Sequence, residues 1–292
     1  MLKQRYLIGM GCCFTCEVQD DCSYTILLKM PHDTTCHRID TSGGNAWEYC
    51  DNINSQIKDL YKVTMTTWIV YNDETPDKTV SHGAHAKGIL AWNDIIVTWL
   101  IHSVPKFPVA FHGTNDFPDI HSSELMYSQS FIHLTFPIRH LQQLLTQLFV
   151  MNPTVYITNY DCKSYAHIHK EKGSSLYKIS RTLHHVAKSP ENHKEFYEDV
   201  LIPEFGGHCY TETWVRGHAC IETKDCTMAK KITWNDTTDY TYTHDHSKYC
   251  YSDNGWVMIG DLNRMTSQCK RGGGGIVIRD KLVCNAFRKI ML

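Results

Sequence analysis

The sequence lacks several features that would place it in a class at once. None of its 292 residues lies in an apolar run of ~18 or more, so we expect no transmembrane helix. It has no low-complexity tract and no long run of like charges, which excludes extended disordered tails of those kinds. Only one C-x-x-C pair occurs (Cys13 and Cys16), and His244-Asp245-His246 has no further ligands at suitable spacing. We therefore expect no metal site and no cofactor.

Two residue types are abundant instead. The chain has 13 cysteines, a number that favours disulfide bonds in an oxidising compartment. One N-glycosylation acceptor, at Asn235, agrees with such a compartment. The chain also has 18 histidines and a formal charge of −2 with histidine neutral. Near pH 5 the exposed imidazoles would be protonated, which would raise the net charge above about +10 and favour a polyanionic partner.

The apolar patterns predict two mixed halves. We expect strands at 23–31, 65–73, 130–137, 154–160, 209–217, 255–262 and 275–280, and a strand pair around Asn93-Asp94 within 88–104. The clearest helix is 138–153, which Pro153 ends, and a second is expected at 191–205. We divide the chain into an N-terminal half, 15–153, and a C-terminal half, 154–292. Residues 1–14 are either a signal-peptide remnant or an ordinary terminal strand.

A longer motif surrounds His246. His-x-Lys triplets alone are no signal, since roughly 1.2 are expected by chance in this composition. After His246 and Lys248, however, the chain continues with four residues, Asp253, six residues, Gly260, two residues and Asn263. The last three matches have a chance probability of order 10⁻⁴. This is the spacing of the phospholipase D superfamily, with Asp261 where serine is usual.

The N-terminal half carries a looser copy, His85, Lys87 and Asn93, with His102 lying 17 residues after His85. The chain as a whole resembles the deoxyribonuclease II family, a branch of this superfamily. The similar segments are "ILLKMP", "HAKG", "LIHSVPKFP", "DHSKYC", "GDLNR" and "KRGGGG", which occur in the family's order. The middle, 160–240, is the least similar part, as in a divergent nematode-type member.

The resemblance implies a mixed α/β fold, in which two pseudo-symmetric halves, each a β-sheet flanked by helices, enclose the active site. It implies a metal-independent acid endonuclease that acts on double-stranded DNA without sequence preference, leaving 3′-phosphate and 5′-hydroxyl ends. His85 would be the nucleophile and His246 the general acid. Lys87 and Lys248 would hold the phosphate. Asn93, Asn263 and His102 would assist them, and Asp253 or Asp245 would orient a histidine.

Other features remain open at this point. "RGGGG" (271–275) either cradles phosphate with bare backbone amides or makes a tight connection before a strand. A bridge between Cys250 and either Cys269 or Cys284 would staple the second motif. Cys16 matches a family cysteine whose usual partner region, 121–135, holds no cysteine here. The family also suggests a homodimer that is lysosomal or secreted, with no membrane attachment.

Two other functions compete with the nuclease. One is a phospholipase D-like phosphodiesterase that acts on lipid, and the "HSVPKFP" and "KRGGGG" segments favour the nuclease over it. The other is a catalytically weak, secreted DNA-binding protein of the same fold. The presence of both His-x-Lys pairs and both asparagines argues for an enzyme.

Overall fold

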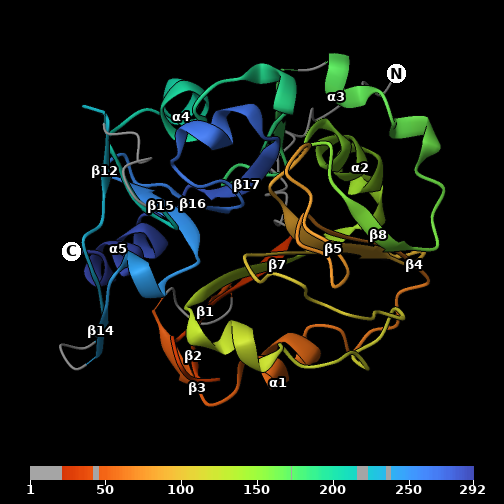
Figure 1. Ribbon diagram of the computed structural model, residues 1–292, viewed down its shortest axis with the longest axis horizontal. Coiled ribbons are helices and arrows are strands. Elements are labelled where there is room, and N and C mark those ends of the chain that lie inside the picture. The colour runs from red at the N-terminus through yellow and green to blue at the C-terminus, as the bar shows by residue number, and fades with distance from the viewer. Residues whose placement is uncertain (1–21, 42–45, 172, 216–222, 235–237) are drawn as a thin grey trace, which may run out of the picture.

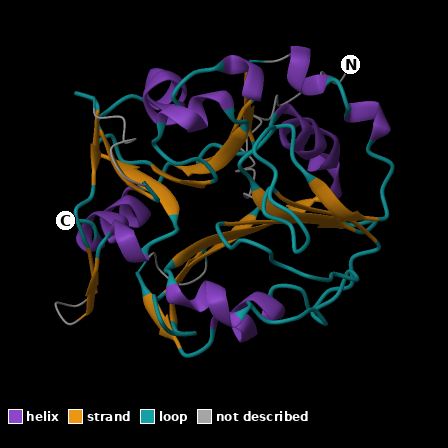
Figure 2. Ribbon diagram, viewed as in Figure 1, coloured by secondary structure: helices purple, strands orange, loops and turns teal. Residues whose placement is uncertain are grey.

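The computed structural model describes residues 22–41, 46–171, 173–215, 223–234 and 238–292 (Figure 1). These residues form a mixed α/β fold that is mostly strand, with short helices around the sheets (Figure 2). The expected signal-peptide remnant, Cys13, Cys16 and the glycosylation acceptor Asn235 lie outside the described residues. No described helix is long and apolar enough to cross a membrane.

The first large sheet holds eight strands in the order β3-β2-β1-β7-β6-β5-β4-β8, and all of its neighbours pair antiparallel. Its centre is built from apolar, β-branched and aromatic residues, which suit a sheet covered on both faces. Its strands are β1 (Ser23–Lys29), β2 (Cys36–Asp40), β3 (Glu48–Cys50), β4 (Thr67–Asn72), β5 (Lys87–Trp92), β6 (Ile96–His102), β7 (Gln129–Pro137) and β8 (Val155–Thr158).

The second large sheet holds seven strands in the order β12-β11-β15-β16-β17-β10-β9. Its one parallel pair joins β11 to β12 at an edge. A separate two-stranded sheet pairs β13 (Ile232–Trp234) with β14 (Thr238–Tyr240). The strands of the seven-stranded sheet are β9 (Ser174–Lys178), β10 (Leu183–Lys188), β11 (Cys209–Thr213), β12 (Cys226–Met228), β15 (Lys248–Ser252), β16 (Val257–Gly260) and β17 (Gly273–Ile278).

The helices are short and cover the sheets. In Figure 1, α1 lies near β2 and β3 of the first sheet, and α5 lies beside β15 at the left. Helix α2 packs against β9 and β10 of the second sheet, although its sequence follows the first. The α-helices are α1 (Ile53–Asp59), α2 (Leu141–Val150), α3 (Ile168–Glu171), α4 (Ile202–Phe205) and α5 (Lys281–Ile290). Single 3₁₀ turns span Ser122–Met126, Ile138–His140, Lys163–Tyr165, Pro190–Asn192, Tyr242–His244 and Thr266–Lys270, and a π turn spans Tyr197–Leu201.

One continuous core joins the two large sheets. Buried residues of β1, β6 and β7 belong to the same apolar cluster as buried residues of β16, β17, α2 and α5. Two further clusters lie on one sheet each, one around Phe111 and one around Trp256. Segments far apart in the chain are therefore held against each other by buried apolar surface.

The boundary between the sheets differs from the expected division after residue 153. Strand β8 (Val155–Thr158) pairs with β4 and completes the first sheet, so the second sheet begins only at β9. The apolar pattern of 154–160 correctly predicts a strand, but a strand's period carries no information about which sheet it joins.

Candidate active site

The two His-x-Lys motifs lie where two strands begin. Lys87 is the first residue of β5 and Lys248 is the first residue of β15. The segment before each strand bridges to the other part of the chain: Ala84 pairs with Gly272, and Asp245 pairs with Ser128. These bridges bring the two motifs together, although His85 and His246 are 161 positions apart.

A small pocket of about 140 Å³ lies between the motifs. Drug-sized ligands occupy pockets of roughly 300–1,000 Å³, so this one is too small for such a ligand. Two of the seven residues that line it are lysines and two are buried histidines. The lining residues are His85, Ala86, Lys87, His102, Ser103, Lys248 and Asp261.

Backbone carbonyls hold the two histidines in a crossed arrangement. His85 Nδ1 lies 2.8 Å from the carbonyl oxygen of Asp261, and His246 Nδ1 lies 2.8 Å from that of Ser103. A carbonyl only accepts, so Nδ1 must carry the proton in both rings. In the neutral ring this leaves the lone pair on Nε2, the atom that a nucleophilic histidine needs.

Both imidazoles are neutral in the free protein. Burial lowers the pKa of His85 to about 3, against the opposing charge of Asp73. Burial, followed by the positive charges of Lys248 and Lys87, holds the pKa of His246 well below its ordinary value. An incoming phosphate anion would favour the protonated form of a nearby imidazole, so a bound substrate would raise the pKa of His246.

His246 also has aromatic neighbours. The Trp214 ring lies 5.4 Å from the His246 ring, centroid to centroid, and Tyr127 lies 6.5 Å away. Tyr127 and Trp214 contact each other edge to face at 4.9 Å. These rings limit the orientations open to the imidazole.

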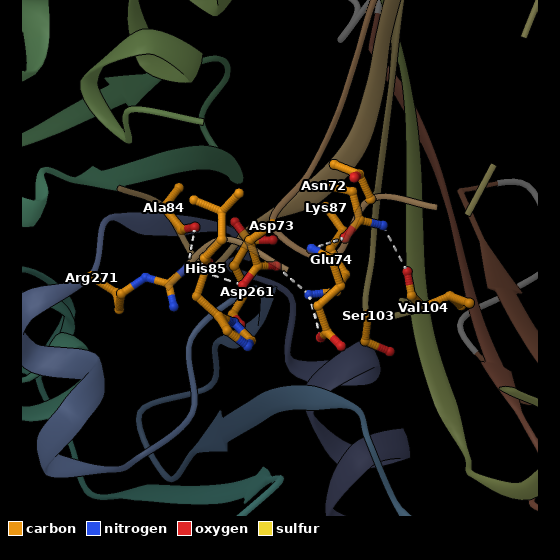
Figure 3. Close-up of polar contacts among 12 residues, drawn as sticks. Asn72, Asp73, Glu74, Ala84, His85, Lys87, Ser103, Val104, Asp261 and Arg271 are labelled. Carbon is orange, nitrogen blue, oxygen red and sulfur yellow. Dashed lines mark hydrogen bonds and ion pairs between the residues drawn. The ribbon is translucent and has the colours of Figure 1, made fainter. Parts of the chain in front are cut away.

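Lys87 is held by a buried group of charges (Figure 3). Its Nζ lies 2.5 Å from Asp73 Oδ1 and 3.4 Å from Glu74 Oε1. The other Asp73 oxygen receives Arg271 Nη2 at 3.0 Å. Burial alone would lower the pKa of Lys87, but the Asp73 carboxylate holds it above its ordinary value. Lys87 is therefore positively charged at any physiological pH.

Lys248 lies in a different environment. Its Nζ donates to the carbonyl oxygen of His246, and no ion pair to a carboxylate holds it among the residues that the structure describes. Burial and the nearby charge of Lys87 lower the pKa of Lys248 to about 7. The two lysines therefore differ: one is always charged, and the other gains full charge only in mildly acidic solution.

His102 faces the pocket with a free donor. Its Nδ1 accepts from the Val104 N–H at 3.2 Å, so the ring proton is on Nε2. That Nε2 is buried and has no hydrogen-bond partner among the described residues. Burial lowers the pKa of His102 to about 3, so the ring is neutral. It can donate one hydrogen bond to an oxygen in the pocket.

Asn93 does not join the site. It lies in the β5–β6 turn, at the opposite end of β5 from Lys87. Its Oδ1 accepts from the N–H groups of Ile95 and Ile96, and its Nδ2 donates to Thr64 O. The expectation that Asn93 holds phosphate is wrong in this structure, because its side chain caps the hairpin turn that the Asn-Asp pair also predicted.

Neither expected orienting carboxylate has a hydrogen bond to the ring of His85 or His246 among the described residues. Asp253 is exposed past the end of β15, where its Oδ1 accepts from the His208 N–H. Asp245 is buried and accepts from the Ser247 N–H. The expectation is wrong because backbone carbonyls take the orienting role at both rings. Asn263 is buried and does not line the pocket, and its Oδ1 has no hydrogen-bond partner among the described residues.

The glycine run makes close backbone packing instead of an open phosphate cradle. A Cβ on Gly272 would lie 1.9 Å from Met151 O, and one on Gly274 would lie 2.6 Å from Val186 O. The Gly272 N–H donates to Gly83 O, and the Gly274 N–H donates to Asp261 Oδ2. The second of the two open readings, a tight connection, is the one that the structure bears out.

The expected bridge from Cys250 to Cys269 or Cys284 is absent. Cys250, Cys269 and Cys284 are free thiols, and Cys250 Sγ lies 3.9 Å from Cys209 Sγ. Cys284 instead donates to Ser252 O at 3.1 Å. Spacing could not reveal this neighbourhood, because Cys209 and Cys250 meet through the pairing of β11 with β15.

Three site residues were not expected from the sequence. Asp73 and Glu74 directly follow β4, next to Lys87 in the strand register, and Arg271 reaches across from the other sheet. A carboxylate that follows a buried strand is a usable signal. Arg271 precedes the glycine run and carries no such signal.

No group of three or more His, Cys, Asp or Glu side chains is arranged to hold a metal ion within the described ranges.

The family model described as Deoxyribonuclease II matches residues 19–292. Deoxyribonuclease-2-beta of Homo sapiens is 30% identical over 264 residues, which cover 79% of this chain and 71% of that protein. Deoxyribonuclease-2 of Caenorhabditis elegans is 31% identical over 247 residues (76% and 64%). Plancitoxin-1 of Acanthaster planci is 26% identical over 310 residues (90% and 86%).

Proposed function

Because the chain belongs to the deoxyribonuclease II family, we propose that the pocket lined by His85, Lys87 and Lys248, with His246 near these three residues, hydrolyses DNA phosphodiester bonds without a metal ion. The observation that carries the proposal is the meeting of both His-x-Lys motifs at one small pocket. Membership of the family supports the hydrolytic nuclease class, and the residue roles below are our proposal.

The first step is attack by His85. Its Nε2 lone pair forms a bond to phosphorus, and the bond from phosphorus to the 5′ oxygen breaks. His246 donates the proton that the departing 5′ oxygen needs. The product of this step is a phosphohistidine on His85 and a 5′-hydroxyl end.

The second step is hydrolysis of that intermediate. His246, now neutral, removes a proton from water as the water attacks phosphorus and the bond to His85 breaks. The strand is left with a 3′-phosphate. His85 must be neutral to attack and His246 protonated to donate. The low pKa of His85 satisfies the first condition. A bound phosphate anion that raises the pKa of His246 from its low value would satisfy the second below neutral pH.

The cations of the pocket replace a metal ion in this scheme. Lys87 and Lys248 neutralise the non-bridging oxygens, and His102 donates a hydrogen bond from Nε2. Lys248 gains its full charge only below about pH 7, which adds to the acid dependence. Asn263 remains a further phosphate ligand in the proposal if substrate binding turns its buried side chain toward the pocket.

An acid environment suits this chemistry, and we propose a lysosomal or secreted location, with a homodimer as the family suggests. The two remaining alternatives are a lipid phosphodiesterase and a DNA-binding protein without turnover. A neutral nucleophile and two lysines would serve a lipid phosphodiester equally well, so membership of the deoxyribonuclease II family is what favours the nuclease.

Plasmid nicking at about pH 5 in excess chelator tests the proposal, beside a choline-release assay. The wild type should convert supercoiled DNA to open circles with chelator present, and the His85→Ala variant should not. Choline release without nicking would support the lipid esterase. Binding of DNA without any nicking by the refolded wild type would support the non-catalytic protein.

A further inference from the structure

The Asp261 carboxyl group is not explained by the mechanism above. It lines the pocket beside His85 (Figure 3), and only 3% of the residue is exposed. Its Oδ2 accepts from the Gly274 N–H at 3.1 Å. Its Oδ1 is buried and has no hydrogen-bond partner among the described residues. An unpartnered buried oxygen at a ligand pocket requires an explanation.

An ionised carboxylate at this position would oppose the reaction. The pocket is built to receive an anionic phosphate, and a second negative charge a few ångströms away would repel it. A protonated carboxyl group has the opposite effect, because its O–H is a hydrogen-bond donor. The protonation state of Asp261 therefore decides whether it repels or binds the substrate.

The groups that face Asp261 come from both large sheets. They include cations, neutral rings, one carboxylate and one buried phenol: Lys87, His85, Lys248, His102, Asp73 and Tyr71. The Asp73 charge is compensated by Lys87 and Arg271, so those cations are largely occupied. Burial raises the pKa of Asp261 to about 8, against the nearby Gly274 and Lys87 backbone N–H groups and the Lys87 charge.

We propose that Asp261 binds the scissile phosphate as a neutral acid, donating a hydrogen bond from Oδ1 to a non-bridging oxygen. The Oδ2 atom, which accepts from Gly274, fixes the orientation of the group. In this role Asp261 is a phosphate-binding residue that also excludes substrate once it ionises. The proposal rests on the proposed function, since it requires that the DNA phosphate enter this pocket.

Proton uptake on DNA binding is the measurement that separates this role from a structural one. At about pH 8.5 most free protein would have ionised Asp261, and binding would return the proton. Isothermal titration in buffers of different ionisation enthalpy counts that proton. A short duplex at low ionic strength is the probe, and a His85→Gln background prevents cleavage.

The expected result is that Asp261→Asn takes up about one proton less than its parent at about pH 8.5, and the same number at about pH 5.5. Lys248 contributes its own proton in both proteins, so it cancels in the comparison. Asp245→Asn is the matched control. Asp245 is also a buried carboxyl with an unpartnered oxygen and a raised pKa, but it does not line the pocket. This control should take up as many protons as the parent.

Equal proton uptake by the parent and Asp261→Asn, with DNA still bound, would overturn this inference and leave the proposed function intact. A change in melting temperature without a change in proton uptake would have the same meaning, since it reports only the bond to Gly274. If Lys87→Met and Lys248→Met bind the duplex as tightly as the parent, the phosphate does not enter the pocket, and both proposals fail.

Discussion

Asp73→Asn is the substitution that best tests how the site is held together. Asp73 joins Lys87 to Arg271, and its side chain is 4% exposed. Asparagine keeps the shape and one acceptor oxygen but removes the charge, which leaves Lys87 buried without a compensating anion of the same strength. Removing one partner of a buried ion pair costs about 3–5 kcal/mol. Because Glu74 remains 3.4 Å from Lys87, we expect the lower end, about 3 kcal/mol.

Activity should fall as well. Lys87 owes its position to hydrogen bonds with charged partners, and each such bond contributes about 1.5–3 kcal/mol. Loss of one bond that matters in the transition state corresponds to a decrease of roughly 10–100-fold in kcat/KM. The assays are urea unfolding followed by tryptophan fluorescence and cleavage of a duplex oligonucleotide.

Asp119→Asn is the matched control. Asp119 pairs with Lys58 at 2.6 Å, but its side chain is 60% exposed. Exposed pairs contribute about 0–1 kcal/mol, so this variant should lose less than ~1 kcal/mol and keep its activity. The comparison isolates burial, since both substitutions remove one carboxylate charge from a lysine.

The pH dependence follows from the direction of the shift. Burial would raise the pKa of Asp73, but Lys87 and the other cations hold it well below its ordinary value. The stabilisation is therefore fully present above the unfolded pKa of about 3.9 and is lost as pH falls through the folded value. The loss in Asp73→Asn should be the same at about pH 5.5 and pH 7. A loss under ~1 kcal/mol at both values, or one as small as in Asp119→Asn, would refute the reasoning.

Two further predictions concern other residues. The KM for DNA should rise between about pH 6 and pH 8, because Lys248 loses its proton near pH 7. Steady-state kinetics over this pH range measure the effect. A constant KM would show that Lys248 does not bind the phosphate as a cation. Asn93→Ala should lose about 1–2 kcal/mol of unfolding free energy, because the turn loses the hydrogen bonds of the Asn93 side chain. Its kcat/KM should stay within about twofold of the wild-type value. A tenfold decrease in kcat/KM would show that Asn93 acts in the active site.

Local patterns predicted most of the strands. The strand at 23–31, the pair around Asn93-Asp94 and the helix beginning after 138 all occur, as β1, β5 with β6, and α2. These segments have clear periods and clear turn residues. Eight strands were not predicted: β2, β3, β9, β10, β12, β13, β14 and β15. All of them except the six-residue β10 have three to five residues, which give too little pattern.

Helix α5 was also missed, although the sequence contains its signal. Asp280 accepts from the N–H groups of Leu282 and Val283 as an N-cap, and Val283, Phe287 and Ile290 are buried at helical spacing.

The candidate site likewise contains residues that the sequence predicted and residues that it did not. The motif residues His85, Lys87 and Lys248 could be read from spacing, and the structure brings them to one pocket. The groups that orient the two histidine rings could not be predicted from the sequence. They are the backbone carbonyls of Asp261 and Ser103, and any residue has such a carbonyl. Asn93 was predicted to belong to the site because it continues the motif in sequence. Its side chain instead stabilises the neighbouring turn.

The most direct test of the central claim is the location of the phosphohistidine. The His246→Ala variant, mixed with a nitrophenyl nucleotide, should still form an adduct on His85, because this leaving group needs no proton. His85→Ala should form no adduct with any substrate. Mass spectrometry after alkaline quenching would locate the phosphate. An adduct on His85 in the His246→Ala variant is the predicted result, and an adduct on His246 in the His85→Ala variant would contradict the account and exchange the two roles.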